Sequence, residues 1–271
     1  MTISDSEELN LAEIDAALAG TAFHGRMQHF RTIDSTNTYA LEQARFKDGS
    51  GSASHGSFYV ADEQTAGRGR SDHSWHSKAG EGLYLSILLR PEIAPADLTW
   101  LPLLAGLAAH QAIHEVTALN ADLRWPNDLL IESRKTGGIL VEALAEEGGA
   151  AAVIGIGINL HQRSFPPGLS TEATSLDLET GRFVSRQQLL IALLQSIQKE
   201  LAAFHSPSTL AAIPARIAAI STWVQGRRVE VHGPQACIGV TNGLDARGFL
   251  RVRTATGLIT ITTGGIREAR G

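Results

Sequence analysis

The sequence predicts a mixed sheet covered by helices, of α/β or α+β class, followed by a small antiparallel β-barrel. Three observations support this. Short apolar runs alternate with longer stretches of helical periodicity over residues 1–222. After Trp223 the helical periodicity stops, and short β runs are separated by turn dipeptides such as Asn242-Gly243. With 271 residues, the chain is long enough for one large domain and a second small one.

The larger part, residues 1–222, is predicted to begin with a flexible or short helical extension over 1–24, of which 1–10 are expected to be disordered. Five segments then have helical spacing, and Asp34-Ser35-Thr36 supplies polar side chains that cap the second of them. The expected helices are Leu11 to Leu18, Thr36 to about Arg45, Pro95 to Val116, Gln187 to Phe204 and Leu210 to Ala219.

Strands in this part are predicted where short apolar runs lack helical spacing. The Gly/Ser-rich segment 49–56 is expected to form a turn region between two of them. The expected strands are Met27 to Ile33, 57–62, 83–89, 121–125, 128–132, 137–145 and 151–160. Helices and strands of this number indicate one sheet with helices packed on it.

The smaller part, residues 223–271, contains only β runs and turns. The expected strands are Arg228 to Val231, Ala236 to Leu244, Phe249 to Arg253 and Leu258 to Thr262. About fifty residues bury little core by themselves, so we expect this part to pack on the larger one.

Composition excludes several classes of protein. The net charge of −5 argues against a general nucleic-acid or membrane binder. The single cysteine, Cys237, excludes a disulfide framework and a cysteine zinc site, so we interpret it as a hydrophobe or a bystander. The acidic N-terminus has no secretory signal, and no apolar run reaches the ~20 residues of a membrane span. We therefore expect a cytoplasmic protein without a membrane segment.

Gly67-Arg68-Gly69-Arg70 is the most informative motif, because it lies between two predicted strands. The glycines permit close approach of the backbone to a ligand, and the arginines offer rigid charged forks for a phosphate or carboxylate. A polar run with Trp75 in its middle follows. The alternative is a solvated turn. The motif is not a P-loop, because the Gly-x-x-x-x-Gly-Lys-Ser/Thr spacing is absent.

Three further motifs combine polar side chains with turns or glycines. Asp34-Ser35-Thr36-Asn37 caps a helix, and its hydroxyl and N–H groups also suit a polar uncharged ligand head such as a urea. Arg124-Trp125-Pro126-Asn127-Asp128 predicts a rigid turn with polar side chains aimed outward. Lys135, followed by the paired glycines Gly137-Gly138, can reach a ligand that lies against bare backbone; a surface lysine is the alternative.

Gly155-Ile156-Gly157-Ile158-Asn159 contains half of a dinucleotide-binding fingerprint, but the third glycine and a following helix are missing. We interpret it as a strand against which a ring can pack, ending in a polar Asn159. The histidines are scattered: His110 and His114 are spaced as on a helix surface, without the glutamate of a zinc-protease motif. We expect no metal site formed by protein ligands alone.

Together these motifs resemble those of biotin protein ligases. The similarity covers nearly the whole chain from about residue 25 onward, and six motifs occur in the order found in the family. They are Asp34-Ser35-Thr36-Asn37; Asp62-Glu63-Gln64-Thr65-Ala66-Gly67-Arg68-Gly69-Arg70, with Trp75 after it; Gly82-Leu83-Tyr84-Leu85-Ser86; Trp125-Pro126-Asn127-Asp128; Lys135-Thr136-Gly137-Gly138-Ile139-Leu140; and Gly155-Ile156-Gly157-Ile158-Asn159.

The resemblance implies an α+β catalytic domain of the class II synthetase and biotin/lipoate ligase type over 1–222, with an SH3-like barrel over 223–271. It also implies two-step chemistry. The carboxylate of biotin attacks the α-phosphate of ATP, with Mg²⁺ as cofactor, to give biotinyl-5′-AMP and pyrophosphate. A lysine of a biotin carboxyl carrier protein then attacks the anhydride and expels AMP.

By the same resemblance, Lys135 and Arg70 are the expected catalytic residues. The residues expected to bind biotin are Ser35, Thr36, Asn37, Gln64, Arg68, Gly69, Arg70, Lys135, Gly137 and Gly138. The residues expected to bind the nucleotide are Arg68, Arg70, Trp75, Asn127, Lys135, Asn159 and Arg267. The arginine loop is expected to act as a lid, because a reactive acyl-adenylate must be shielded from water.

The sequence departs from the family pattern after the arginine loop, where Asp72 and His73 stand in place of the usual glycine and arginine. About twenty-five residues precede the first family strand, too few for a winged helix-turn-helix, so no DNA binding is expected. The alternatives are a lipoate or octanoate ligase or transferase of the same fold, and a non-enzymatic biotin sensor. An RNA-binding loop is disfavoured by the net charge. A homodimer is left open, and the sequence predicts neither the ligand affinities nor the identity of the carrier.

Overall fold

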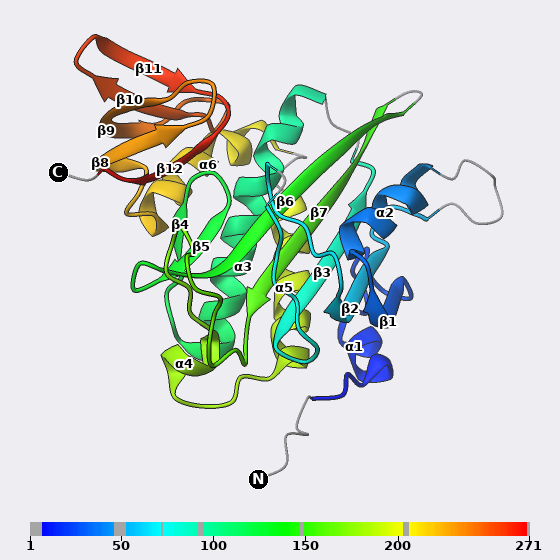
Figure 1. Cartoon of the computed structure of the whole chain (residues 1–271). Helices are drawn as coiled ribbons and strands as arrows, with labels where there is room; N and C mark the ends of the chain where they lie inside the picture. The colour runs from blue at the N-terminus through cyan, green and yellow to red at the C-terminus, as the bar shows by residue number, and fades with distance from the viewer. Residues whose placement is uncertain are drawn as a thin grey trace.

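Two β-sheets organise the molecule (Figure 1). The computed structural model describes residues 7–45, 53–71, 73–91, 95–146, 149–202 and 206–269. The larger sheet has seven strands in the order β1-β2-β3-β7-β6-β5-β4. These strands are β1 (Met27–Ile33), β2 (Phe58–Gln64), β3 (Gly82–Leu89), β4 (Asp122–Arg124), β5 (Asp128–Ile131), β6 (Arg134–Glu146) and β7 (Gly149–Asn159).

The larger sheet is mixed, as predicted. β1 and β2 are parallel, and each other pair of neighbours is antiparallel. α2 forms the crossover between the two parallel strands, since it lies between them in the chain. This arrangement confirms the α+β class. β6 is longer than predicted, because the strand already begins at Arg134, three residues before the first of the paired glycines.

Helices are the other regular elements of this larger part. They are α1 (Leu11–Ala17), α2 (Thr36–Arg45), the 3₁₀ helix η1 (Pro95–Trp100), α3 (Leu101–Thr117), α4 (Leu176–Thr180), α5 (Arg186–Leu201) and α6 (Pro207–Ile220). The single helix predicted from Pro95 to Val116 is therefore wrong in its first part. The α-helix begins at Leu101, and Pro102, which has no N–H to donate, fits in its first turn.

Two short segments also differ from the prediction. α4 was not expected; Ser175 caps its start by accepting a hydrogen bond from the N–H of Leu178, and Gly181 ends it in the left-handed conformation. Residues 1–10 were expected to be disordered, but Glu7 accepts hydrogen bonds from Ser185 and from the N–H of Arg186 at the start of α5. The first described residues are therefore tied to the body of the protein.

The two faces of the larger sheet are covered differently. Side chains alternate between the faces along each strand, so Leu85 and Ile87 of β3 face the main core with α3 and α5. Leu88 of β3 and Val153 of β7 lie on the other face, packed against α2. All eight residues of β3 are buried as a result. Figure 1 shows α3 and α5 behind the sheet and α2 on its front. The front face beyond the N-terminus of α2 is where a ligand can reach the sheet.

The smaller sheet has five antiparallel strands in the order β11-β10-β9-β8-β12. They are β8 (Gln225–His232), β9 (Cys237–Leu244), β10 (Leu250–Thr254), β11 (Gly257–Ile261) and β12 (Gly265–Glu268), of which β12 was not predicted. The small β domain is confirmed, but it is not closed into a barrel: among the described residues no pairing joins β11 to β12.

The smaller sheet packs on the larger part, as expected. Its buried residues Val229 and Val252 belong to the same continuous apolar core as α3 and the larger sheet. Trp125, in the turn after β4, donates from Nε1 to the carbonyl oxygen of Gly248 at 3.1 Å. No helix in the described ranges is long and apolar enough to cross a membrane.

Candidate active site

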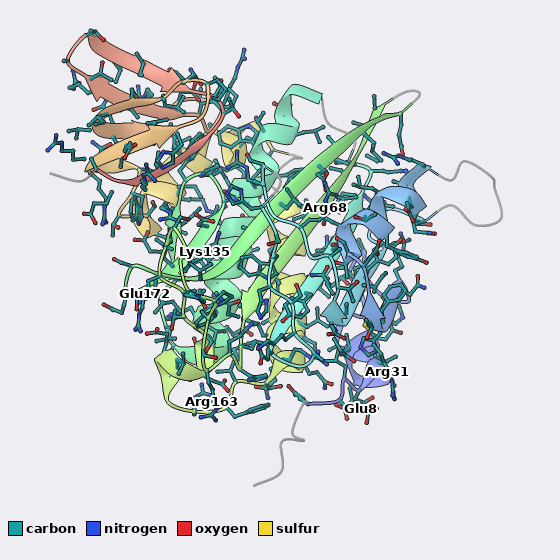
Figure 2. The ribbon with its side chains drawn as sticks, viewed as in Figure 1. Glu8, Arg31, Arg68, Lys135, Arg163 and Glu172 are labelled. Carbon is teal, nitrogen blue, oxygen red and sulfur yellow. The ribbon has the colours of Figure 1, made fainter. Side chains whose placement is uncertain are left out.

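A cleft of about 980 Å³ lies on the front face of the larger sheet, beside the N-terminus of α2. Its walls are the start of α2, the arginine loop 66–77, the turn 124–128 and the loop of the smaller sheet that contains Gly264. Figure 2 shows Arg68 and Lys135 on this front side of the sheet. The two sheets therefore both contribute to one site.

The floor of the cleft is bare backbone. Gly138 of β6 and Gly157 of β7 are directly paired across the sheet, and their missing side chains leave room for Trp75 of the arginine loop. A Cβ at Gly157 would stand 2.5 Å from Trp75 Nε1, and one at Gly138 would stand 3.3 Å from Trp75 Cζ3. At Gly155, a Cβ would overlap the side chain of Asn37. These glycines permit the close approach that was predicted for them.

Gly137 does not belong to this floor. Its missing side chain points to the opposite face, where a Cβ would stand 3.0 Å from Leu129 Cδ1. Neighbouring residues of a strand face opposite sides, so Gly137 and Gly138 cannot both line one cleft. Gly138 and Gly157 line the cleft and Gly137 does not, so a ligand contact at Gly137 stays a prediction.

A buried polar cluster closes one end of the cleft. Gln64 Oε1 accepts from the N–H of Thr36 at 2.9 Å and from its hydroxyl at 3.1 Å. Ser86 Oγ lies 2.8 Å from both Thr36 Oγ1 and Asn37 Oδ1. Ser35, Thr36 and Asn37 are each at most 4% exposed. The structure thus brings together the predicted polar residues of the helix start and of β2, because β2 ends beside the N-terminus of α2.

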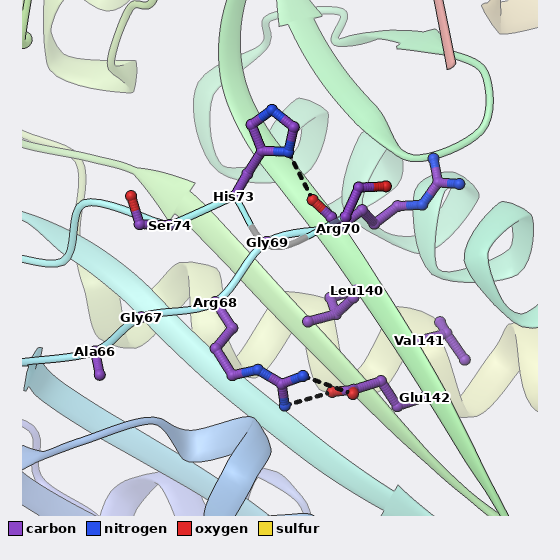
Figure 3. A pocket seen from close by; sticks show the side chains of 11 residues that line it. Ala66, Gly67, Arg68, Gly69, Arg70, His73, Ser74, Leu140, Val141 and Glu142 are labelled. Carbon is purple, nitrogen blue, oxygen red and sulfur yellow. Dashed lines mark hydrogen bonds and ion pairs between the residues drawn. The ribbon is translucent and has the colours of Figure 1, made fainter. Parts of the chain in front are cut away.

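Arg68 meets a carboxylate that the sequence analysis did not single out. Its NH1 and NH2 donate to Glu142 Oε2 and Oε1 at 2.9 and 2.8 Å (Figure 3). Asn37 Nδ2 also donates to Glu142 Oε2, at 2.8 Å. Glu142 therefore joins the arginine loop to the start of α2. The sequence could have placed Glu142 on the face of β6 that Gly138 occupies, because the two residues are four positions apart in one strand.

Arg70 joins the arginine loop to the opposite wall. Its NH1 donates to Asn127 Oδ1 at 3.1 Å and to the carbonyl oxygen of Gly264 at 3.0 Å. Burial lowers the pKa of Arg70 from its ordinary value, and the nearby Asp128 carboxylate opposes that shift. Asn127 is oriented by donating from Nδ2 to the carbonyl oxygen of Ile139 at 2.7 Å. In this structure the loop is closed over the cleft and fastened to both sheets.

Lys135 lies at the centre of the cleft wall. Its ammonium is 2.5 Å from Asp128 Oδ1 and 5.5 Å from the ring centre of Trp75. Asp128 Oδ2 is also 2.6 Å from Arg124 NH2. Burial by itself raises the pKa of Asp128, but the charges of Lys135 and Arg124 outweigh it and hold the pKa below its ordinary value. Lys135 is thus paired with a carboxylate whose pKa is held low.

Three further predicted residues line the cleft: Asn159 and Arg267, expected to bind the nucleotide, and Gly69, expected to bind biotin. Asn159 is 6% exposed and donates from Nδ2 to the carbonyl oxygen of Thr174 at 3.0 Å. Arg267 of β12 pairs with Glu230 at 2.9 Å and has a side chain that is 52% exposed. Gly69 shapes the turn of the loop by donating its N–H to the carbonyl oxygen of His73 at 2.6 Å. All three line the cleft.

Of the two departures from the family pattern, only one can be located. Asp72 lies outside the described residues. His73 is exposed, and its Nδ1 lies 2.8 Å from the carbonyl oxygen of Arg70, so its ring packs back on the loop (Figure 3).

The arrangement is suited to a ligand with a polar head and a negatively charged end. The polar cluster of Thr36, Gln64 and Ser86 can exchange hydrogen bonds with an uncharged head group, while Arg68 and Lys135 can bind an anion. The Nε1 of Trp75 is buried without a hydrogen-bond partner among the described residues. In the same part of the chain, no group of three or more His, Cys, Asp or Glu side chains could hold a metal ion.

Comparisons with known proteins place a chain of this fold in one family of ligases. The chain belongs to the biotin/lipoate A/B protein ligase family, whose model matches residues 29–159, and within it to the biotin protein ligases.

Three relatives support this assignment. The biotin--[acetyl-CoA-carboxylase] ligase of Mycobacterium tuberculosis is 30% identical over 87% of this chain and 86% of its own length. A solved structure of biotin protein ligase from Aquifex aeolicus, in complex with biotin and ATP, is similar with a TM-score of 0.76 and 30% identity, covering 90% of this chain and 100% of that one. The bifunctional ligase/repressor BirA of Bacillus subtilis is 38% identical over 71% of this chain. The match covers only 58% of that relative's own length.

Proposed function

We propose that this chain activates biotin with ATP to form biotinyl-5′-AMP and transfers the biotinyl group to a lysine of a biotin carboxyl carrier protein. The observation that carries the proposal is the meeting of three cations, Arg68, Arg70 and Lys135, on a cleft that also has a glycine floor and a closed polar end. The named biotin ligases among its relatives support the same activity.

The polar end favours biotin over lipoate or octanoate. Biotin has a ureido head that both donates and accepts hydrogen bonds, and the side chains of Thr36, Gln64 and Ser86 offer both kinds of group. These side chains bond to one another and to their neighbours in this structure, and a ureido head can take over some of those bonds, whereas an octanoyl or lipoyl chain has no polar head to do so. The ring system would pack beside the indole of Trp75, which itself lies against Gly138 and Gly157.

The cations suit the chemical step. Attack of the biotin carboxylate on the α-phosphate brings two anions together and develops negative charge on the phosphoryl oxygens. Lys135 is the cation placed to contact both groups, once its ammonium moves from Asp128 toward them. The new bond joins a carboxylate oxygen to the α-phosphorus, and pyrophosphate leaves. Arg70, which fastens the loop to Asn127 and to Gly264, would keep water from the anhydride.

Magnesium fits this site as a partner of the nucleotide. Mg²⁺ usually binds to substrate phosphates together with one or two protein carboxylates. Asp128 is a cleft carboxylate that is held ionised, so it is the residue that would assist in binding the ion. When bound, the ion would neutralise charge on the phosphates.

In the second step the ε-amine of the carrier lysine attacks the anhydride carbon, forms an amide and releases AMP. We further propose that residues 1–222 form the biotin- and ATP-binding domain and that residues 223–271 form the second domain. The lack of DNA binding, the cytoplasmic location and a homodimer stay predictions from the sequence.

A mass-shift assay tests the proposal. The full chain is incubated with MgATP, an unmodified carrier domain and biotin, and in parallel with octanoate or lipoate. The expected result is an increase in the carrier mass by one biotinyl group that depends on ATP. Modification with octanoate or lipoate alone would assign the other branch of the family. Tight biotin binding without any transfer would indicate a sensor.

A further inference from the structure

We propose that His232 of β8 binds the pyrophosphate part of ATP, in an arm of the cleft that the smaller sheet supplies. His232 lines the cleft, as does Arg267 of β12. The inference deepens the proposed function and rests on it in taking ATP as the second substrate. It concerns a residue that lies outside the sequence motifs and outside the chemistry proposed above.

The strand order of the larger sheet places Lys135 between the polar cluster and the smaller sheet. Ser86 of the polar cluster is on β3, Lys135 is on β6, and Arg124 is on β4 at the edge of the sheet. The guanidinium of Arg124 lies 5.3 Å from the ring centre of Trp223, just before β8. A biotin with its head in the polar cluster and its carboxylate at Lys135 therefore leaves the space beyond Lys135 for ATP.

One wall of this space is apolar. It is formed by the loop between β7 and α4, which is bonded to the strand of Lys135: the N–H of Lys135 donates to the carbonyl oxygen of Glu172 at 2.7 Å. Figure 2 shows these two residues close together. The loop lines the cleft with Phe165, Pro166 and Leu169. None of these three side chains can bind an anion.

The other wall is supplied by the smaller sheet and is charged. His232 is paired with Gly265 across β8 and β12, and Arg267 is two residues further along β12, so both side chains leave the same face. A Cβ at Gly265 would meet no atom within 4 Å, so the space beside His232 is open. Arg70 donates to the carbonyl oxygen of Gly264, the residue before Gly265, and thus reaches the same wall from the arginine loop.

The two walls match the two parts of ATP that flank the α-phosphate. Adenosine is uncharged and aromatic, whereas the β- and γ-phosphates are anionic. When the carboxylate attacks the α-phosphorus, the bond from this phosphorus to the bridging oxygen breaks, and pyrophosphate leaves with the electron pair. Fixed donors and cations stabilise the charge that develops on the leaving group. We therefore place the pyrophosphate at His232 and the adenosine at the apolar loop.

His232 is free to serve as a donor. In the described part of the chain, no other residue makes a hydrogen bond with its ring nitrogens. Burial and the charge of Arg267 lower the pKa of His232 from its ordinary value; Glu230 opposes this shift, and Arg124 adds to it. An anion beside the ring favours the protonated form. The contribution of His232 to phosphate binding should therefore grow as the pH falls.

The test replaces His232 by glutamine, which keeps an N–H donor but cannot take up a proton. His114→Gln is the matched control, because His114 is an exposed histidine of α3 that does not line the cleft. Calorimetry with the full chain measures the Kd for MgATP, for pyrophosphate with Mg²⁺, for AMP and for biotin at pH 6, 7 and 8.

We expect His232→Gln to weaken the binding of MgATP and of pyrophosphate about fivefold at pH 6 and at most about twofold at pH 8, as for the loss of one charge-assisted hydrogen bond. The Kd values for AMP and biotin should stay unchanged, and His114→Gln should alter none of the four. Equal weakening for AMP and MgATP, or an effect that does not grow as the pH falls, would overturn the inference.

His232→Arg separates the contact from a general effect of the substitution. This variant keeps a cation at every pH, so it should bind pyrophosphate at least as tightly as the wild type at pH 8. Weaker binding there would contradict a contact between residue 232 and the phosphates.

The proposed function can fail separately from this inference. If the wild-type chain binds MgATP but forms no biotinyl-5′-AMP, the proposed function fails, and the same Kd values still test His232. If the wild type forms the adenylate and His232→Gln binds MgATP equally well at all three pH values, the function stands and the inference fails. A chain that binds neither ATP nor pyrophosphate overturns both.

Discussion

The indole of Trp75 lies directly against the backbone of Gly157. A Cβ at Gly157 would stand only 2.5 Å from Trp75 Nε1. The residues are 82 positions apart in the chain, yet the arginine loop and β7 meet here to define the depth of the cleft. The position of the arginine loop therefore depends on the absence of a side chain at Gly157.

Replacing Gly157 by alanine should therefore weaken ligand binding more than it weakens the fold. The added methyl group must push Trp75 away, and overpacking of this kind costs about 1–3 kcal/mol. We expect the KM for biotin to rise about tenfold, measured by pyrophosphate release. Gly239→Ala is the control: its Cβ would be equally crowded, 2.5 Å from the carbonyl oxygen of Arg253, but it lies in the smaller sheet. It should lower the melting temperature and leave the KM unchanged. An unaltered KM in Gly157→Ala would show that Trp75 is not held against the floor during binding.

Lys135→Ala should abolish formation of biotinyl-5′-AMP. The variant loses the cation that faces both reacting anions, and removal of one such group typically costs about 10²–10³-fold in rate. It also leaves Asp128 with Arg124 alone, so a negative charge in the cleft is less well balanced. Single-turnover formation of the adenylate is the direct measurement. Adenylation at near the wild-type rate would remove Lys135 from the mechanism.

Arg70→Gly should release the intermediate. The variant loses the two hydrogen bonds that Arg70 makes to the opposite wall, to Asn127 and to the carbonyl oxygen of Gly264. We expect free biotinyl-5′-AMP to accumulate and to label lysines of a bystander protein. Arg253→Gly, at an exposed position of β10, provides the control and should not release the intermediate. Unchanged retention in Arg70→Gly would contradict the role of the loop as a lid.

Asp128→Asn should destabilise the protein in a pH-dependent manner. The folded-state pKa of Asp128 is lowered below the ordinary value of 3.8, despite burial, by Lys135 and Arg124. Its ion pairs therefore add stability above the ordinary pKa and lose it as the pH falls through the folded-state value. The variant should lose about 3 kcal/mol of unfolding free energy at pH 7, since it leaves two cations without their partner. The difference from the wild type should shrink below about pH 4. Urea unfolding at pH 7, 5, 4 and 3 gives the measurement; a difference that stays constant over this range would contradict the assigned ionisation.

Local signals were sufficient for much of the fold. β1 and α2 have the predicted bounds, Met27–Ile33 and Thr36–Arg45, because alternation and capping act over a few residues. The helix predicted to begin at Pro95 failed because a 3₁₀ turn and an α-helix share composition and differ only in hydrogen bonding. The strand β12 has four residues, too few for a periodic signal.

The candidate site was predictable in its residue types but not in its pairings. The arginine loop, the polar helix start and Lys135 were each marked by local spacing and by resemblance to the family. The sequence did not distinguish Gly137 from Gly138, because only the pleat of β6 decides which of the two glycines faces the cleft. Glu142 was missed because nothing in its own segment marks it as a partner of Arg68, 74 residues away.

The sequence by itself therefore determined the class of fold, the positions of most strands and helices, and the family of the protein, because these depend on periodicity and on short ordered motifs. The tertiary structure decided which partner each cation of the site meets: Arg68 pairs with Glu142, Lys135 pairs with Asp128, and Arg70 donates to a carbonyl oxygen in the second sheet. Contacts of this kind depend on strand order and register across the whole chain, and no local pattern carries that information.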